Sequence, residues 1–298
     1  MKSSPPGTAH PVRYVLWGDG DSPHLLKWAR ALAALPQLEL WAASSRGFLP
    51  GFDACVPAER RLALATRPDA AGGNFALLKQ LPRLVRWLKQ VDAAVLHAHY
   101  LSSHGTLAWL ARRLFGVRAA LVASAWGSDI LVAPARSRVL RWATQRVLRD
   151  ALLSTSDSQV MAQRMVALGG QPPLVFPFGL DALPPPPPEK AATAFFANRG
   201  LEPIYHPERV QKVFEDLADP AAELVVANDG SLRAALQASA AANVRFVGRL
   251  DATTQATHYA QAQWYISLPH SDSVAVSVLE AMAHGCIPIL SDLPANRE

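Results

Sequence analysis

Short apolar runs alternate with segments of helical periodicity along the first 183 residues. The apolar runs, rich in strand-favouring residues, span 14–20, 38–45, 93–100, 119–126, 151–157 and 173–179. Between most of them, segments such as 24–35 and 139–148 place apolar residues at positions i, i+3 and i+4, the spacing of an amphipathic helix. This alternation predicts βαβ units and a parallel, doubly wound sheet.

Five consecutive prolines, Pro184–Pro188, interrupt this alternation. Such a run cannot enter a helix or a central strand, and it favours a polyproline II strut of about 15 Å. We interpret residues 184–192 as an interdomain linker; the alternative is a rigid surface loop within one domain. The pattern restarts at Thr193, with predicted strands at 193–199, 223–229, 244–250, 264–269 and 287–292, and predicted helices at 207–217, 231–241, 253–262 and 276–284. The sequence therefore predicts two Rossmann-like α/β domains, at 1–183 and 193–298, with ligands bound beyond the carboxyl ends of their strands.

Composition narrows the class of protein. The chain has 298 residues, of which 50% are hydrophobic and 18% charged, as is usual for a soluble globular protein. Its two cysteines, Cys55 and Cys286, are too few for a disulfide framework or a cysteine-built metal site, which favours a reducing, cytoplasmic compartment. Residues 1–11 lack the apolar segment of a signal peptide, and no stretch approaches the roughly 20 apolar residues of a membrane span. We therefore expect neither a secreted mini-domain nor an integral membrane protein.

Charge is distributed unequally. Residues 1–183 hold 21 Lys and Arg against 11 Asp and Glu, a net of +10, whereas residues 184–298 hold 8 against 13, a net of −5. An anionic partner is therefore expected for the first domain. Within it, segment 76–91 has helically spaced apolar residues and four cations, Lys79, Arg83, Arg86 and Lys89. Such a segment can lie on an anionic bilayer, which would place the protein at the inner face of the membrane. We favour the alternative of an ordinary outer helix packed on the sheet.

The strongest local signal is the stretch SLPHSDSVAVSVLEAMAHGCIPILSD, residues 267–292. It predicts a strand, a loop that carries Asp272, and a helix that begins at about 275–278 with Glu280 in its first turns. The amide groups and the positive dipole end of such a helix form a site for a diphosphate. Gly285 is expected to end the helix, because it can adopt positive φ.

These residues resemble a known family. Asp272 and Glu280, seven residues apart, with AMAHGCIPIL following, are similar to the E-x7-E signature of the retaining GT-B glycosyltransferases of family 4, with Asp272 at the place of the first Glu. The blocks LHAHYLSSHG (96–105), ASAWGSDIL (123–131) and ANRGLEPIYHPERVQKVFEDL (197–217) are similar to further family segments. The resemblance implies a GT-B architecture, with the acceptor bound by 1–183 and the nucleotide-sugar by 193–298. It also leads us to expect that the second domain lacks its last strand and helices after Glu298.

The resemblance further implies a role for each candidate residue. Arg199 would stabilise the leaving diphosphate, Glu280 would hold the ribose, and Asp272 would hold the transferred sugar. Donor contacts are further expected from the loop and helix start, Ser273, Val274, Ala275, Val276 and Ser277, and from Gly18 and Arg249. His99 and Asp129 are the catalytic candidates of the first domain. Transfer with retention needs no protein nucleophile, and neither a metal nor a cofactor is expected.

Several candidates have a structural alternative. We expect His97 and His99 to point to opposite faces of their strand, and of the two we choose His99, at the carboxyl end; a hydrogen-bonded core histidine is the alternative. Asp129 is equally suited to a helix cap or a turn. Asp19-Gly20-Asp21 resembles a metal-binding DxD motif, but its place after the first strand favours a turn.

The expected function is hexosyl transfer in polysaccharide biosynthesis. The donor would be a UDP-, GDP- or ADP-sugar and the acceptor an anionic glycan or a lipid-linked molecule; no nucleic-acid partner is expected. One alternative is a non-catalytic nucleotide-sugar binder, because Ile204-Tyr205-His206 stand where the family commonly has Lys, and Trp126 where many members have His. A nucleotide-sugar epimerase is a second alternative.

Overall fold

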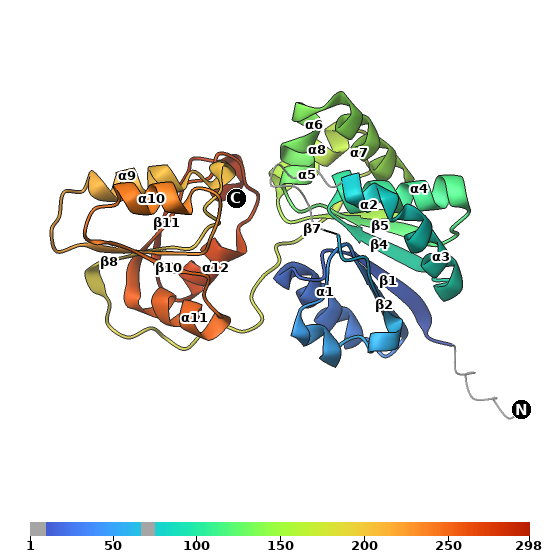
Figure 1. Ribbon diagram of the computed structural model, residues 1–298, viewed down its shortest axis with the longest axis horizontal. Helices are drawn as coiled ribbons and strands as arrows, with labels where there is room; N and C mark the ends of the chain where they lie inside the picture. The colour runs from blue at the N-terminus through green and yellow to red at the C-terminus, as the bar shows by residue number, and fades with distance from the viewer. Residues whose placement is uncertain (1–9, 67–74) are drawn as a thin grey trace, which may run out of the picture. The chain divides into compact units, whose positions relative to one another are not determined.

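The computed structural model describes residues 10–66 and 75–298, apart from the Phe75 side chain. It divides into two compact units (Figure 1). The first contains the chain up to Asp157 together with Met161–Phe176, and the second contains Ser158–Val160 and Pro177–Glu298. Among the described residues, no helix is both long and apolar enough to cross a membrane.

The first unit is a parallel sheet of seven strands, in the order β3-β2-β1-β4-β5-β6-β7. Its strands are β1 (Val12–Gly18), β2 (Leu38–Ser44), β3 (Arg61–Ala63), β4 (Val95–His99), β5 (Ala120–Ser124), β6 (Leu153–Ser156) and β7 (Leu174–Val175). Its helices are α1 (Pro23–Ala33), η1 (Pro50–Ala54), η2 (Ala58–Arg60), α2 (Phe75–Lys79), α3 (Leu81–Val91), η3 (Leu101–Gly105), α4 (Thr106–Phe115), α5 (Ser128–Leu131), α6 (Ala133–Arg136), α7 (Arg138–Asp150) and α8 (Gln159–Ala167). The run predicted as a strand at 173–179 forms only the two-residue β7.

Helices cover both faces of this sheet. On one face, α3, α4, α7 and α8 pack around Leu96 and Leu121. On the other face, α1 and η1 pack around Leu16 and Leu40. The result is the predicted doubly wound layer structure.

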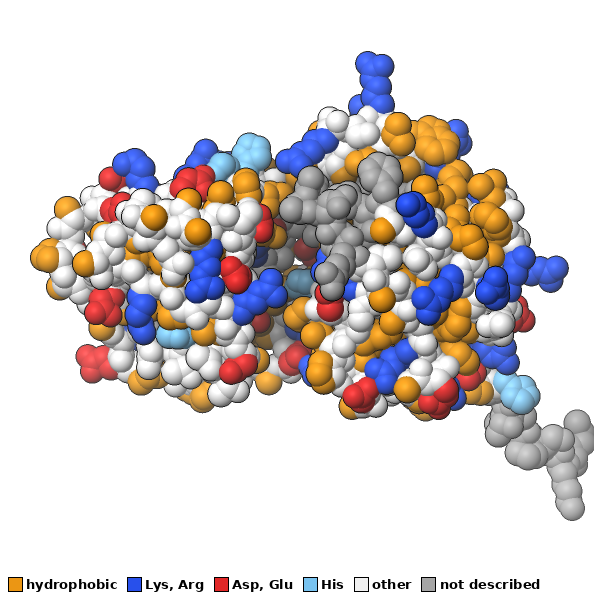
Figure 2. Space-filling view, in the orientation of Figure 1, with side chains coloured by type: hydrophobic (Ala, Val, Ile, Leu, Met, Phe, Trp, Pro, Cys, Tyr) orange, Lys and Arg blue, Asp and Glu red, His pale blue; other side chains and the backbone are white. Residues whose placement is uncertain are grey.

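Helix α3 lies within segment 76–91, which could be either a helix that lies on a bilayer or an ordinary outer helix packed on the sheet. Its apolar residues Leu81, Leu84, Val85 and Leu88 are buried in the core. Lys and Arg side chains stand out to solvent over this part of the first unit (Figure 2). The apolar face is therefore not available to a bilayer, and α3 is an ordinary outer helix packed on the sheet.

The second unit is a parallel sheet of five strands, in the order β10-β9-β8-β11-β12. Its strands are β8 (Ala191–Ala197), β9 (Glu223–Ala227), β10 (Val244–Gly248), β11 (Ala262–Ser267) and β12 (Ile287–Leu290). Its helices are η4 (Pro203–Tyr205), α9 (Pro207–Glu215), α10 (Arg233–Ser239), α11 (Ala252–Gln261), α12 (Val276–Ala283) and η5 (Pro294–Arg297). Helices α9 and α10 pack around Leu224, and α11 and α12 pack around Tyr265, on opposite faces. Both units thus have the predicted Rossmann-like architecture.

The end of the proline segment is fastened to this second unit. The ammonium group of Lys190 donates to the carbonyl oxygens of Tyr259 and Ala262, at 3.0 and 2.8 Å. Gly285 has φ +74°, as expected of the residue that ends α12. A Cβ atom at Gly285 would lie 2.9 Å from the Pro187 ring, so this position also requires glycine for the close approach. Strand β8 begins at Ala191, two residues earlier than expected.

Candidate functional site

Two of the predicted donor-site residues, Arg199 from the block at 197–217 and Asp272 from the C-terminal motif, come together in the second unit. Arg199 follows β8, and Asp272 lies in the loop after β11, so the two residues stand at the carboxyl ends of neighbouring parallel strands. One Arg199 Nη donates to Asp272 Oδ2 at 2.5 Å, and the other donates to Ser277 Oγ in the first turn of α12 at 3.2 Å. The tertiary structure thus brings together the residue predicted to bind the diphosphate, the residue predicted to bind the sugar, and the start of α12.

Arg199 keeps its charge at this site. Burial by itself lowers its pKa, but the Asp272 carboxylate and the neighbouring Tyr265, Tyr205 and Tyr259 together outweigh burial, and the pKa is raised overall. The guanidinium carbon also lies 4.5 Å from the centre of the Tyr205 ring, a cation–π contact. The buried Nε has no hydrogen-bond partner among the residues that the structure describes. A permanent cation with an unused donor is suited to an anionic ligand.

Asp272 is held between two opposing influences. Burial raises its pKa, whereas the charge of Arg199 and the amide of Ser273, which donates to Oδ1 at 3.0 Å, act in the opposite direction. The net pKa is raised. The loop continues through buried Ser273, half-buried Val274 and buried Ala275 to the helix start.

The N-terminus of α12 lacks a side-chain cap. Ala275 is the N-cap residue and has no side chain that could accept from the first-turn amides. Val276 and Ser277, the first two helical residues, carry amide groups of the kind that bind phosphate oxygens at a helix start. The predicted donor contacts at 273–277 therefore lie beside the Arg199–Asp272 pair.

Glu280 is positioned by a buried hydrogen-bond network that the motif analysis missed. Its Oε2 lies 3.1 Å from both Gln255 Nε2 and the Tyr259 hydroxyl. That hydroxyl lies 3.1 Å from the Ser277 carbonyl oxygen as well, and it accepts from Asn198 Nδ2 at 2.7 Å. Tyr265 in turn donates to Asn198 Oδ1 at 2.7 Å. We call Asn198, Tyr259, Tyr265 and Glu280 the tyrosine network.

Burial keeps both tyrosines of this network neutral. It raises the pKa of Tyr265 to about 12 and that of Tyr259 further. Each is therefore a hydrogen-bond donor at physiological pH. The sequence held a signal for them, since a tyrosine in an apolar run needs a partner for its hydroxyl once it is buried.

Arg249 does not join this cluster. It is exposed in the loop after β10, and β10 is separated from β8 by β9. Its donor-binding role stays a prediction.

In the first unit, both histidines of β4 point to the same side of the sheet. The centres of the His97 and His99 rings are 4.1 Å apart, and both rings contact Trp28. The expectation of opposite faces is wrong, because side chains alternate along a strand and residues two apart share a face. Burial lowers the pKa of His97 to about 3 and that of His99 well below its ordinary value.

The two histidines differ in their hydrogen bonds. His97 contacts the hydroxyls of Tyr14, at 2.9 Å, and Ser124, at 2.7 Å, and is a hydrogen-bonded core histidine. Trp126 donates to His99 Nδ1 at 3.3 Å, and His99 Nε2 has no hydrogen-bond partner within the described ranges. His99 also approaches Gly18, where a Cβ would lie 3.2 Å from the His99 Cβ. Gly18 thus permits close packing at the end of β1.

Asp129 is buried and anchors two loops. Its carboxylate accepts from the Leu101 amide at 2.7 Å and from the Trp126 amide at 3.0 Å. Burial raises its pKa to about 6 despite these bonds. The contacts match the turn-forming role considered for this residue, and its catalytic role stays a prediction.

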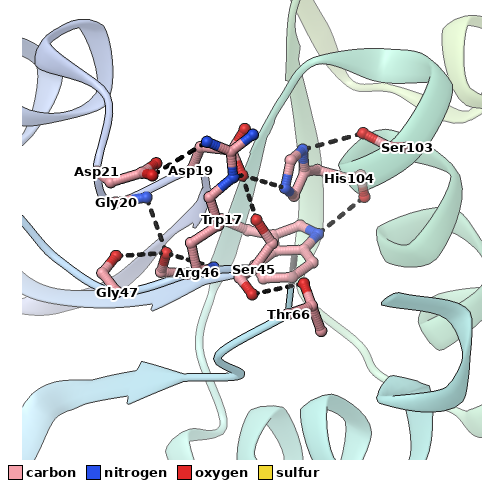
Figure 3. Close-up of polar contacts among 11 residues, drawn as sticks. Trp17, Asp19, Gly20, Asp21, Ser45, Arg46, Gly47, Thr66, Ser103 and His104 are labelled. Carbon is pink, nitrogen blue, oxygen red and sulfur yellow. Dashed lines mark hydrogen bonds and ion pairs between the residues drawn. The ribbon is translucent and has the colours of Figure 1, made fainter. Parts of the chain in front are cut away.

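The Asp19-Gly20-Asp21 segment forms a turn, in which the Ser22 amide donates to the Asp19 carbonyl oxygen at 3.0 Å. The Asp19 side chain lies in a polar cluster at the ends of β1 and β2 (Figure 3). Ser45 donates to its carboxylate, and His104 Nε2 lies 3.4 Å away. Burial raises its pKa, but His104, Ser45 and the charge of Arg46 together lower it to about 2.

Gly20 allows the turn to lie against the following loop. A Cβ atom there would stand 2.6 Å from the Gly47 carbonyl oxygen and from the Phe48 ring. The turn interpretation of the DxD-like segment is therefore supported. No group of three potential metal ligands occurs within the described residues.

The chain forms two doubly wound α/β units. The second unit places an arginine and an uncapped helix start at the ends of its strands. This combination defines a nucleotide-binding class of protein. Residues 20–180 match the family model for the glycosyl transferase 4-like domain, and residues 184–298 match that for glycosyl transferases group 1. The chain belongs to the glycosyl transferase 4-like family and is a glycosyltransferase of the GT-B fold.

Solved structures share this fold at low sequence identity. Anabaena HepE, in complex with UDP and glucose, is 14% identical with a TM-score of 0.71 over 95% of this chain and 82% of that chain. Sucrose-phosphate synthase from Thermosynechococcus elongatus is 15% identical with a TM-score of 0.71 over the same shares. A putative UDP-N-acetylglucosamine 2-epimerase from Listeria monocytogenes is 14% identical with a TM-score of 0.63 over 96% and 81%. No curated protein matches the chain.

Proposed function

We propose that the chain is a retaining, metal-independent glycosyltransferase that moves a hexosyl group from a nucleotide-sugar to a cell-surface glycan or a lipid-linked acceptor. The observation that carries the proposal is the contact of Arg199 with both Asp272 and Ser277 at the start of α12. HepE has been solved with UDP and with UDP-glucose, which makes UDP the nucleotide we expect first. The second unit would hold the donor and the first unit the acceptor.

The proposed step breaks the bond between the sugar C1 and the diphosphate oxygen. The acceptor hydroxyl oxygen bonds to C1 on the same face, and its proton passes to the departing phosphate. Negative charge accumulates on the nucleoside diphosphate as that bond lengthens. Arg199 and the amides of Val276 and Ser277 would stabilise this charge, which is the role that a metal ion otherwise fills.

Donor binding would rearrange the charges around Arg199. In the structure the guanidinium is neutralised by Asp272 at 2.5 Å. A bound diphosphate would replace part of the contact between Asp272 and the Arg199 guanidinium. Asp272 would then accept hydrogen bonds from the hydroxyls of the transferred sugar. Glu280, held by Gln255 and Tyr259, would accept from the ribose hydroxyls.

A panel of UDP-, GDP- and ADP-sugars tests this proposal. We expect release of one nucleoside diphosphate that depends on an added acceptor, with the anomeric configuration of the product equal to that of the donor. Interconversion of the donor sugar without an acceptor would instead indicate an epimerase. Tight binding without turnover, across a broad set of acceptors, would indicate a non-catalytic nucleotide-sugar binder.

A site variant links this activity to the geometry. Glu280→Ala should abolish nucleotide binding while lowering the free energy of unfolding by only about 1–2 kcal/mol, because Glu280 is half-buried on α12 and its side chain makes two hydrogen bonds, with Gln255 and Tyr259. Glu208→Ala, an exposed acid in α9, is the matched control. Equal nucleotide affinity in both variants would remove Glu280 from the site.

A further inference from the structure

Helix α7 of the first unit carries a cationic face with exposed apolar side chains. One side of the helix, which includes Ala143, Thr144, Val147 and Leu148, is buried. The opposite side is exposed and holds Arg138, Val139, Arg141, Trp142, Arg146 and Arg149, which we call the arginine–tryptophan face. These positions follow the three- and four-residue spacing of a single helix face.

The four arginines are not neutralised by neighbouring acids. None of them forms an ion pair with a residue in the described part of the chain, whereas Arg112 and Arg113 of the adjacent α4 both pair with Asp150. Four like charges on one face destabilise the helix slightly and produce a strong local positive potential. Ion pairing within the described part of the chain therefore does not account for them.

Large apolar side chains are exposed among these charges. Val139 is 72% exposed and Trp142 is 48% exposed, and on α4 Leu114 is 68% exposed. The Trp142 ring packs edge-on against Trp109 of α4, with 5.6 Å between ring centres, and the Arg146 guanidinium lies 5.5 Å from it. Hydrophobic side chains gather over α7 and α4, with Lys and Arg side chains at their border (Figure 2).

We propose that the arginine–tryptophan face docks on an anionic lipid bilayer. Arginines supply attraction to anionic headgroups, and an exposed tryptophan with neighbouring aliphatic side chains is suited to the region between headgroups and acyl chains. Helix α3 provides the contrast, because its solvent face carries Arg83, Arg86 and Lys89 but no exposed large apolar side chain other than Pro82. The proposal is independent of glycosyl transfer, since vesicle binding requires neither donor nor acceptor.

Sedimentation with vesicles tests the proposal on the full chain. The vesicles contain phosphatidylcholine with either about one-third phosphatidylserine or none. At low salt we expect binding to the anionic vesicles only. Arg141→Gln with Arg146→Gln should weaken it roughly 30-fold, about fivefold per arginine. The matched control, Arg83→Gln with Arg86→Gln, removes the same charge from α3 and should change the affinity by less than about threefold.

Trp142→Ala separates a bilayer from other anionic partners. It should weaken vesicle binding several-fold while the binding that remains stays sensitive to salt. Equal losses in the two double variants would overturn the assignment to α7, because only the net charge would then matter. Absence of binding to anionic vesicles at low salt would overturn the proposal. If Trp142→Ala binds vesicles as well as the parent does, and polyphosphate displaces the protein from them, the partner of this face is an anionic polymer rather than a bilayer.

Discussion

Replacement of Tyr259 by phenylalanine tests whether the tyrosine network positions the donor site. The variant keeps the buried ring and removes one hydroxyl, which contacts Glu280, Ser277 and Asn198 at 3.1, 3.1 and 2.7 Å. A net loss of roughly 1 kcal/mol for each of two to three hydrogen bonds predicts a decrease of about 2–3 kcal/mol in the free energy of unfolding. Urea denaturation measures this decrease.

The effect on nucleotide binding distinguishes positioning from general stability. Without Tyr259, Gln255 alone among the contacts described above holds Oε2 of Glu280. We expect roughly tenfold weaker nucleotide binding by titration calorimetry, about 1.4 kcal/mol. Because the effect passes through Glu280, Tyr259→Phe should have little further effect in a Glu280→Gln background.

Tyr265→Phe is the matched control for this experiment. It removes another buried hydroxyl, the donor to Asn198 Oδ1, and leaves both contacts of Glu280 in place. We expect a loss of about 1 kcal/mol in the free energy of unfolding, for this one hydrogen bond, and less than threefold loss of nucleotide affinity. Equal losses of affinity in the two variants, or full additivity of Tyr259→Phe with Glu280→Gln, would refute the positioning role.

Three further predictions concern other parts of the molecule. Arg199→Ala should lower kcat by about 100-fold or more, because a hydrogen-bond donor aimed at the leaving group is lost. The control variant Arg209→Ala, at an exposed position, should leave kcat unchanged. If Arg199→Ala is as active as the parent, Arg199 is excluded from the mechanism. Gly20→Ala should lower stability by about 1–3 kcal/mol, since its Cβ meets the Gly47 carbonyl, whereas Gly47→Ala has nothing within 4 Å and should be neutral in a thermal melt. Burial lowers the pKa of His97 to about 3, so the unfolded chain binds the extra proton below about pH 6.5, and stability should fall between pH 6.5 and 3. In urea titrations, His97→Gln should make that fall shallower, and an unchanged slope would contradict the buried neutral state.

The architecture followed largely from periodicity in the sequence. Alternating apolar runs and helical segments predicted both parallel sheets, because a strand buried on two faces and an amphipathic helix leave different patterns. The exceptions are short edge elements. Residues 173–179 resemble a strand but pair only at Leu174–Val175, since a strand at the edge of a sheet has one neighbour and few ladder bonds.

The candidate site was predicted in part. Asp272 and Glu280 were identified from one local motif, and the structure brings Arg199 against Asp272 across 73 residues of sequence. Asn198 and Tyr259, 61 residues apart, were missed. Their contact depends on the packing of α11 against β8, which no local pattern in either segment reports.

The sequence by itself determined the order of strands and helices, the basic character of the first unit, and the residue types available for an anionic ligand. Only the tertiary structure decided which side chains meet and which helix face remains open. Periodicity identifies the apolar side of a helix but does not say what covers the other side. Helix α3 buries its leucines and valines, keeps Trp87 half-buried, and exposes cations, Gln90 and Pro82. In contrast, α7 exposes Trp142 and Val139 among its arginines. That difference arises from packing, because burial depends on neighbours brought together from distant parts of the chain.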